Sequence, residues 1–135
     1  MARILIPFAE PDGALRAVAR ILDEPPGPRL SVHLLAAVEP LRPGKVRMFV
    51  SADAAEAQVR DAARRWLAPL EAALRAVGAE VTTEISLGPP RATIRAATAR
   101  PGFDRVILPS EVPREYERAA SRVATPHAAT RAASA

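Results

Sequence analysis

Two short runs of apolar residues near the start of the sequence constrain the fold more than any other feature. They are Ile4 to Phe8 and Leu30 to Val38. Continuous apolar runs of this length are typical of strands buried on both faces of a parallel sheet. The residues between them have helical periodicity, which the Pro-Pro-Gly-Pro run at 25–28 ends. The first 40 residues therefore predict one β-α-β unit with a right-handed crossover.

The next pair of predicted elements repeats this order. Residues 53–77 place apolar side chains on one side of a long helix, and Gly78 stands where that helix stops. Pro69 lies inside the pattern and should kink or split the helix. Val81 to Leu87 alternates between apolar and polar residues. One face of that strand is therefore wetter than the other, which predicts a position near a sheet edge.

A third helix–strand pair completes the pattern. It consists of a helix after Pro90 and a strand over residues 103–108, and Pro113 can open one last helix. Residues 126–135 have neither periodicity nor branched aliphatic side chains, so we expect a disordered tail. The sequence thus predicts one α/β domain over residues 1–125, built as a single open, mostly parallel sheet with helices on both faces.

Composition excludes several classes of function. The chain has no cysteine, which excludes zinc–thiolate sites, disulfides and thiol catalysis. Aromatic residues make up 4% of the 135 residues and the net charge is +4, so nucleic acid is an unlikely partner. No apolar stretch approaches the roughly 18 residues of a membrane span. The apolar run after Arg3 is too short for a secretion signal. We expect a cytoplasmic protein with no membrane contact.

Five short segments of the sequence follow one another in an order and spacing that are informative about the fold. They are Ile4–Pro7, Leu34–Pro40, Leu70–Gly78 followed by Val81–Glu84, Leu87–Pro90, and Asp104–Ser110. Together, over roughly residues 2–112, this succession resembles the universal stress protein family. The resemblance implies the strand order 3-2-1-4 and a fifth strand that often pairs across a dimer. That fifth strand is missing from the sequence beyond Pro126.

Many proteins of that family bind ATP through a glycine-rich turn after the fourth strand. The turn reads Gly, two residues, Gly, nine residues, Gly, Ser/Thr, and its bare N–H groups surround phosphate. In this sequence Pro109 and Val112 stand at the first two glycines, and Arg122-Val123 at the final pair. Ala9 replaces the Asp that contacts the adenine end. The resemblance therefore implies a retained fold with a degenerate nucleotide site.

Two functional hypotheses follow. The first is a non-catalytic module without a cofactor, acting by homodimerisation or by binding a protein partner. The alternative is an ATP-binding universal stress protein with a divergent loop, in which Arg114 and the N-terminus of the last helix hold phosphate. If a nucleotide binds, the expected site residues are Pro7, Ala9, Val38, Pro109, Ser110 and Arg114.

Single residues with possible chemistry have simpler interpretations. Ser110 is expected to cap the last helix, because a nucleophilic serine needs a base and an orienting group. His33 is expected to be a hydrogen-bonded core histidine, and His127 lies in the predicted tail. No catalytic residue and no metal site are predicted.

Charged residues near the expected nucleotide site also have simpler interpretations. The carboxylates Glu10, Asp12, Glu39 and Glu111 could surround a cation, but each stands at a turn or helix start, where acidic residues are favoured. Arg114, Arg118 and Arg122 form a ridge that we interpret as a solvated, salt-bridged helix face.

The connection over residues 39–52 is long and unusually apolar. It carries Leu41, Val46, Met48, Phe49 and Val50. Such residues are too apolar to lie free in water. One interpretation is that these residues cap the core of the domain itself. The other is that they cover the vacant nucleotide site or pack against a second subunit. The sequence favours neither interpretation over the other.

Overall fold

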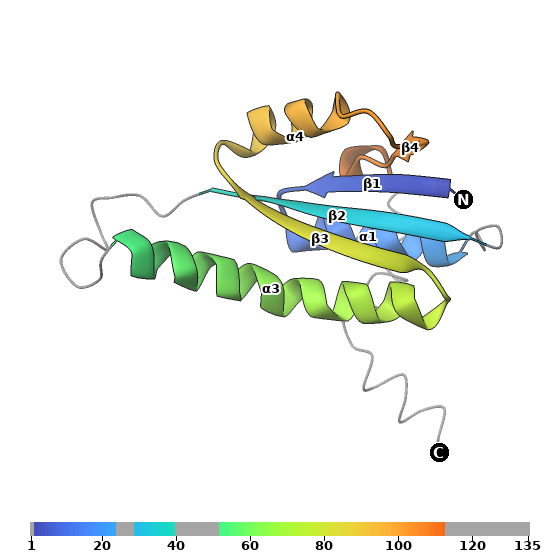
Figure 1. The fold of residues 1–135 in the computed structure, drawn as a ribbon, viewed down its shortest axis with the longest axis horizontal. Helices are drawn as coiled ribbons and strands as arrows, with labels where there is room; N and C mark the ends of the chain where they lie inside the picture. Colours follow the sequence, from blue (N-terminus) through green and yellow to red (C-terminus); the bar gives the residue numbers. More distant parts are fainter. Residues whose placement is uncertain (1, 24–28, 40–51, 113–135) are drawn as a thin grey trace, which may run out of the picture.

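The computed structural model describes residues 2–23, 29–39 and 52–112. Its elements alternate as the sequence predicts (Figure 1). In chain order they are β1 Ala2–Phe8, α1 Pro11–Asp23, β2 Leu30–Val38, α3 Ala52–Ala76, β3 Glu80–Leu87, α4 Pro90–Thr98, β4 Arg105–Val106 and the short 3-10 helix η1 Pro109–Glu111. The predicted last helix, the tail over 126–135 and most of the 39–52 connection lie outside the described residues.

The strands form one parallel sheet in the order β3-β2-β1-β4, which confirms the predicted topology. The edge position predicted for β3 is also confirmed. The prediction for the fourth strand is wrong in its length. Only Arg105 and Val106 form the strand, paired with Ile4 and Leu5 of β1. Gly102, at φ 94°, turns the chain just before β4, and η1 begins soon after it, so little extended chain remains.

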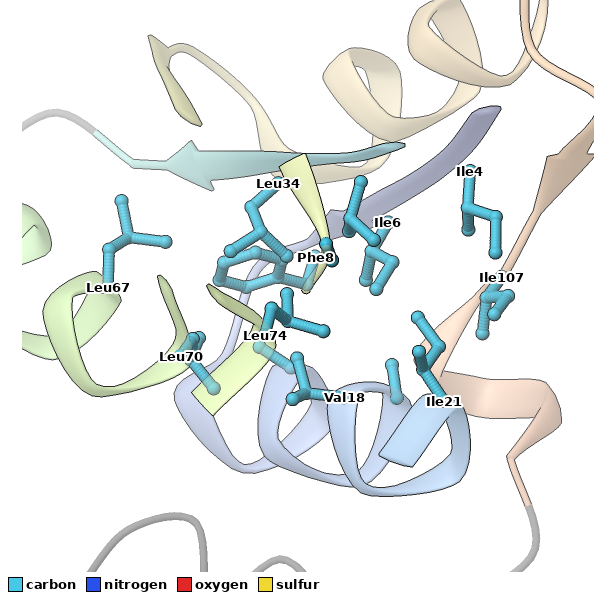
Figure 2. Packing of buried hydrophobic residues seen from close by; sticks show 14 of the residues in the cluster. Ile4, Ile6, Phe8, Val18, Ile21, Leu34, Leu67, Leu70, Leu74 and Ile107 are labelled. Atoms are coloured by element: carbon cyan, nitrogen blue, oxygen red, sulfur yellow. The ribbon is translucent and has the colours of Figure 1, made fainter. Parts of the chain in front are cut away.

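Helices cover the two faces of the sheet unequally (Figure 1). α1 and α3 pack side by side against one face, while α4 lies on the other, over β1 and β2. Successive residues of a strand point to opposite faces, so the even-numbered residues of β1 and β2 meet α1 and α3. That face holds the main core, which Figure 2 shows around Ile6, Phe8 and Leu34.

The α4 face holds a much smaller apolar cluster. Its buried members are Leu5, Leu35, Ala37 and Ala97, and Ile94, Phe103 and Val106 pack against them. The same face of β3 carries the polar residues of the alternating pattern, Thr82 and Glu84 among them. One half of this face is thus apolar under α4, and the other half is polar.

The long helix α3 is continuous over 25 residues, so Pro69 does not split it. The helix ends as predicted at Gly78, whose φ of 86° lies in the left-handed region. The Gly78 N–H donates to the Arg75 carbonyl at 3.0 Å, and the Ala79 N–H donates to the Leu74 carbonyl at 3.1 Å. These two bonds form a Schellman motif, with buried Ala79 and Leu74 making its apolar contact.

None of the helices in the described part of the chain is long and apolar enough to cross a membrane.

Candidate functional site

The residues predicted to surround a nucleotide gather at the carboxyl ends of the strands. Pro7 is buried within β1, and Ala9 is exposed directly after that strand. Val38 ends β2 and is half-buried. Pro109 and Ser110 lie in η1, just past β4. Arg114 falls outside the described residues. This end of β1 and β4 is the switch point of the topology, where open α/β sheets place their ligands.

Pro109 lies directly against the first turn of α1. A Cβ placed on Gly13 would lie 2.8 Å from the Cβ of Pro109, closer than real side-chain carbons approach each other. The absence of a side chain at Gly13 thus allows η1 to pack on α1. Phe8, by contrast, points away from this end into the main core, where its ring meets Trp66 edge-on at 5.3 Å.

Two backbone N–H groups at η1 donate hydrogen bonds within the turn itself. The Glu111 N–H donates to the Leu108 carbonyl at 2.9 Å, and the Val112 N–H donates to the Pro109 carbonyl at 3.2 Å. Pro109 itself has no N–H. The Val112 side chain is buried and belongs to the main core.

Acidic residues at this end do not gather into a metal site. Glu10, Asp12, Glu39 and Glu111 are all exposed. Over residues 2–23, 29–39 and 52–112, no group of three or more His, Cys, Asp or Glu side chains could hold a metal ion.

A second polar group lies on the α4 side of β2 and β3. His33 of β2 is in register with Thr82 of β3, and its Nδ1 lies 2.6 Å from Thr82 Oγ1. The other ring nitrogen, Nε2, lies 3.1 Å from Glu84 Oε1. The expectation of a hydrogen bond to His33 is therefore confirmed. The expectation of burial is wrong in degree, because the side chain is only half-buried, with 19% of its surface exposed.

Arg100, two residues beyond the end of α4, forms a bidentate ion pair with the Glu84 carboxylate. Its Nη1 and Nη2 each donate to one carboxylate oxygen, both at 2.8 Å. Hydrogen bonds from Arg100, and to a smaller extent the one from His33, lower the pKa of Glu84 to about 2 against the opposing effect of burial. The same pairing raises the pKa of Arg100. Glu84 is therefore a carboxylate at any physiological pH.

The chain between α4 and β4 is attached to the same surface. The ring of Phe103 stacks on the His33 imidazole with centroids 6.0 Å apart and planes inclined by 26°. The guanidinium of Arg3 lies 5.3 Å from the Phe103 ring centre. Asp104 accepts the Arg3 backbone N–H at 2.8 Å. These contacts hold the His33 ring in one orientation.

The amino-acid sequence alone does not predict this group. The alternation in Val81–Leu87 does place Thr82 and Glu84 on the wetter face of β3. The residue that joins them comes from a strand 49 positions earlier in the chain. Only the pairing register of β2 with β3 brings His33 between them.

Comparison with protein families agrees with the fold described above. No curated protein and no solved structure is significantly similar to the chain. The family model of the universal stress protein family matches residues 1–125. The chain belongs to the universal stress protein family.

Proposed function

We propose that this universal stress protein is a non-catalytic cytoplasmic module that binds a second copy or a protein partner and has lost nucleotide binding. The observation that carries the proposal is the packing of Pro109 on Gly13. It brings η1 and the first turn of α1 into contact at the end of β1 and β4, where open α/β sheets bind their ligands.

The backbone of the loop supports the same proposal. A phosphate cradle needs several N–H groups that point outward from a bare backbone. In η1 the N–H groups of Glu111 and Val112 already donate to carbonyls of the same turn. Turning them outward would break both bonds and pull the buried Val112 side chain from the core. Each of these changes costs free energy that phosphate binding would have to offset.

Nucleotide titration tests this part of the proposal. ATP, ADP and cyclic nucleotides are expected to leave the melting temperature unchanged and to give no saturable heat. A ligand present at about 100 times its Kd would stabilise the protein by about 2.7 kcal/mol. For a domain of this size, that is a shift of several degrees, which is easily measured. Saturable micromolar binding would contradict the proposal and favour the divergent loop with Arg114.

Self-association is argued from the two sheet edges. An unpaired strand edge is a template for pairing with another chain. On β3, Arg60 of α3 reaches over the edge and donates to the Ile85 carbonyl at 3.2 Å. This bond occupies an acceptor that an incoming strand would need. Within the described residues no strand flanks the outer side of β4. We therefore assign self-pairing to the β4 edge.

Sedimentation equilibrium across a wide concentration range tests that assignment. A reversible dimer is expected, and Arg60→Ala is expected to leave its dissociation constant unchanged, since β3 is not used. A strictly monomeric protein at all concentrations would overturn the homodimer and leave binding of a different protein. If Arg60→Ala instead dimerises more tightly than the wild type, the dimer contact lies on the β3 edge.

A further inference from the structure

Thr82, His33 and Glu84 connect a hydroxyl, an imidazole and a carboxylate in one chain of hydrogen bonds. The contacts measure 2.6 Å from Thr82 Oγ1 to His33 Nδ1 and 3.1 Å from His33 Nε2 to Glu84 Oε1. A nucleophilic hydroxyl needs this connection, in which a base takes its proton and a third group orients the base.

The protonation of the chain follows from the donors and acceptors. An ionised carboxylate can only accept hydrogen bonds, so the hydrogen between Glu84 and His33 must reside on Nε2. In a neutral imidazole the other nitrogen, Nδ1, then carries a lone pair. With His33 neutral, the contact with Thr82 is then an O–H donated to Nδ1. Glu84 in this way selects the tautomer in which His33 can act as a base toward the hydroxyl.

The geometry keeps the base in place while leaving the hydroxyl accessible. Arg100 fixes Glu84 through both carboxylate oxygens, and Phe103 stacks on the His33 ring. Thr82 lies on the edge strand and is exposed. An electrophile can therefore reach Oγ1 from solvent.

We propose that Thr82 is a covalent acyl-acceptor site, activated by His33 and oriented through Glu84, which takes an acyl group from an activated ester. Thr82 Oγ1 attacks the carbonyl carbon while its proton moves to His33 Nδ1. The bond to the leaving group breaks, and that group departs with the electron pair as an anion. The imidazolium formed is held against Glu84 until it returns its proton to water. One acyl group is transferred per chain, so the proposal goes beyond binding without requiring turnover.

The test uses the full chain and p-nitrophenyl acetate, with the acetylated residue located by peptide mass spectrometry. Background reaction is simple to separate here, because the chain has no cysteine and Lys45 is its only lysine. Acetyl-Thr82 is expected in the wild type. Thr82→Val is expected to lose it, and Thr82→Ser to keep it. Thr83→Ala is the matched control, since Thr83 is an exposed threonine on the opposite face of the same strand.

The role of the base is tested with His33→Ala. Its rate of Thr82 acetylation is expected to fall about 100-fold, the lower end of the range for general base catalysis. Added imidazole is expected to restore part of that rate, which a merely structural role of His33 would not allow. Glu84→Gln tests orientation without emptying the position, and is expected to slow labelling at least about 10-fold. Labelling confined to Lys45 and the N-terminus, or Thr82 labelling unaffected by His33→Ala, would overturn the proposal.

Discussion

At the scale of single residues, Gly13 and Pro109 act as a pair. Helix interiors usually favour alanine over glycine by roughly 0.5–1 kcal/mol. In α1 that preference is reversed, because a methyl group on Gly13 would lie 2.8 Å from the Pro109 Cβ. The proline ring is rigid and cannot turn aside. Gly13 is therefore required by the position of η1 rather than by its own helix.

Gly13→Ala is expected to destabilise the protein by about 1–3 kcal/mol, the usual range for an overpacked contact. In a Pro109→Gly background the same substitution should instead stabilise by about 0.5–1 kcal/mol, since the contact is gone. Urea unfolding of the four proteins gives the coupling free energy directly. Additive effects of the two substitutions would contradict the contact.

Glu84 gives a second prediction at this scale, concerning pH. Its pKa of about 2 in the folded protein is lower than the ordinary value of 4.5 for a glutamate side chain. Between these two values the unfolded chain binds more protons, so the stability from this group rises with pH. The contribution is full above about pH 4.5 and is lost as the pH falls toward 2. Because the side chain is 35% exposed, solvent screening limits it to about 1 kcal/mol.

The measurement is urea unfolding at several pH values between 2.5 and 6, chosen to span that window. The wild type is expected to lose about 1 kcal/mol more than Glu84→Gln over this range. Glu80→Gln serves as control, since Glu80 is exposed on the same strand. It should follow the wild type. Parallel pH profiles for the wild type and Glu84→Gln would contradict the ion pair.

At the scale of elements, α3 shows how packing overrides local preference. A proline inside a helix removes a backbone hydrogen bond and crowds the preceding turn, at a cost of about 3 kcal/mol. The helix nevertheless continues through Pro69, with Leu67, Leu70 and Leu74 all buried against the sheet. Burying these three leucines contributes several kcal/mol, enough to keep one helix where the local sequence favours two.

Pro69→Ala is therefore expected to stabilise the protein by about 1–3 kcal/mol, because it restores the lost hydrogen bond without removing a core contact. Urea unfolding measures the change. Ala68→Gly is a control at the neighbouring exposed position, where a loss of about 1 kcal/mol is expected from helix propensity alone. A destabilised Pro69→Ala would show that the proline ring itself stabilises the native packing.

At the scale of the whole molecule, the two faces of the sheet differ in how much apolar surface they bury. The face under α1 and α3 holds the main core, and the α4 face combines a small apolar cluster with a polar half. Two adjacent residues of β2 are fully buried on opposite faces of the sheet: Leu34 lies in the main core, and Leu35 lies in the cluster under α4. They provide a matched comparison of the two cores.

Leu34→Ala is expected to cost about 4–5 kcal/mol and Leu35→Ala about 2–3 kcal/mol, within the range for buried leucines. The larger loss is expected at Leu34, because it is enclosed by two helices and the sheet, whereas the small cluster under α4 can collapse more easily. Thermal and urea unfolding of both variants measure the difference. Equal losses would show that the α4 face is as well packed as the main core.

The sequence by itself determined the alternation of strands and helices, the end of α3 at Gly78 and the edge position of β3. These follow from apolar periodicity and from glycine's access to positive φ, which are local properties of the chain. The replacement of glycines by Pro109 and Val112 is visible in the sequence as well. The contacts that those residues make are not visible in the sequence, because Gly13 and Pro109 are distant in the chain.

Only the tertiary structure decided the remaining features. The length of β4 depends on how many residues fit between the turn at Gly102 and η1. The partial exposure of His33 depends on how segments distant in the chain pack around it, and its partners depend on the register of β2 with β3. A shift of that register by one residue would turn the polar side chains of β3 to the other face. Non-local pairing therefore created the Thr82–His33–Glu84 group, since nothing local in the sequence joins these residues.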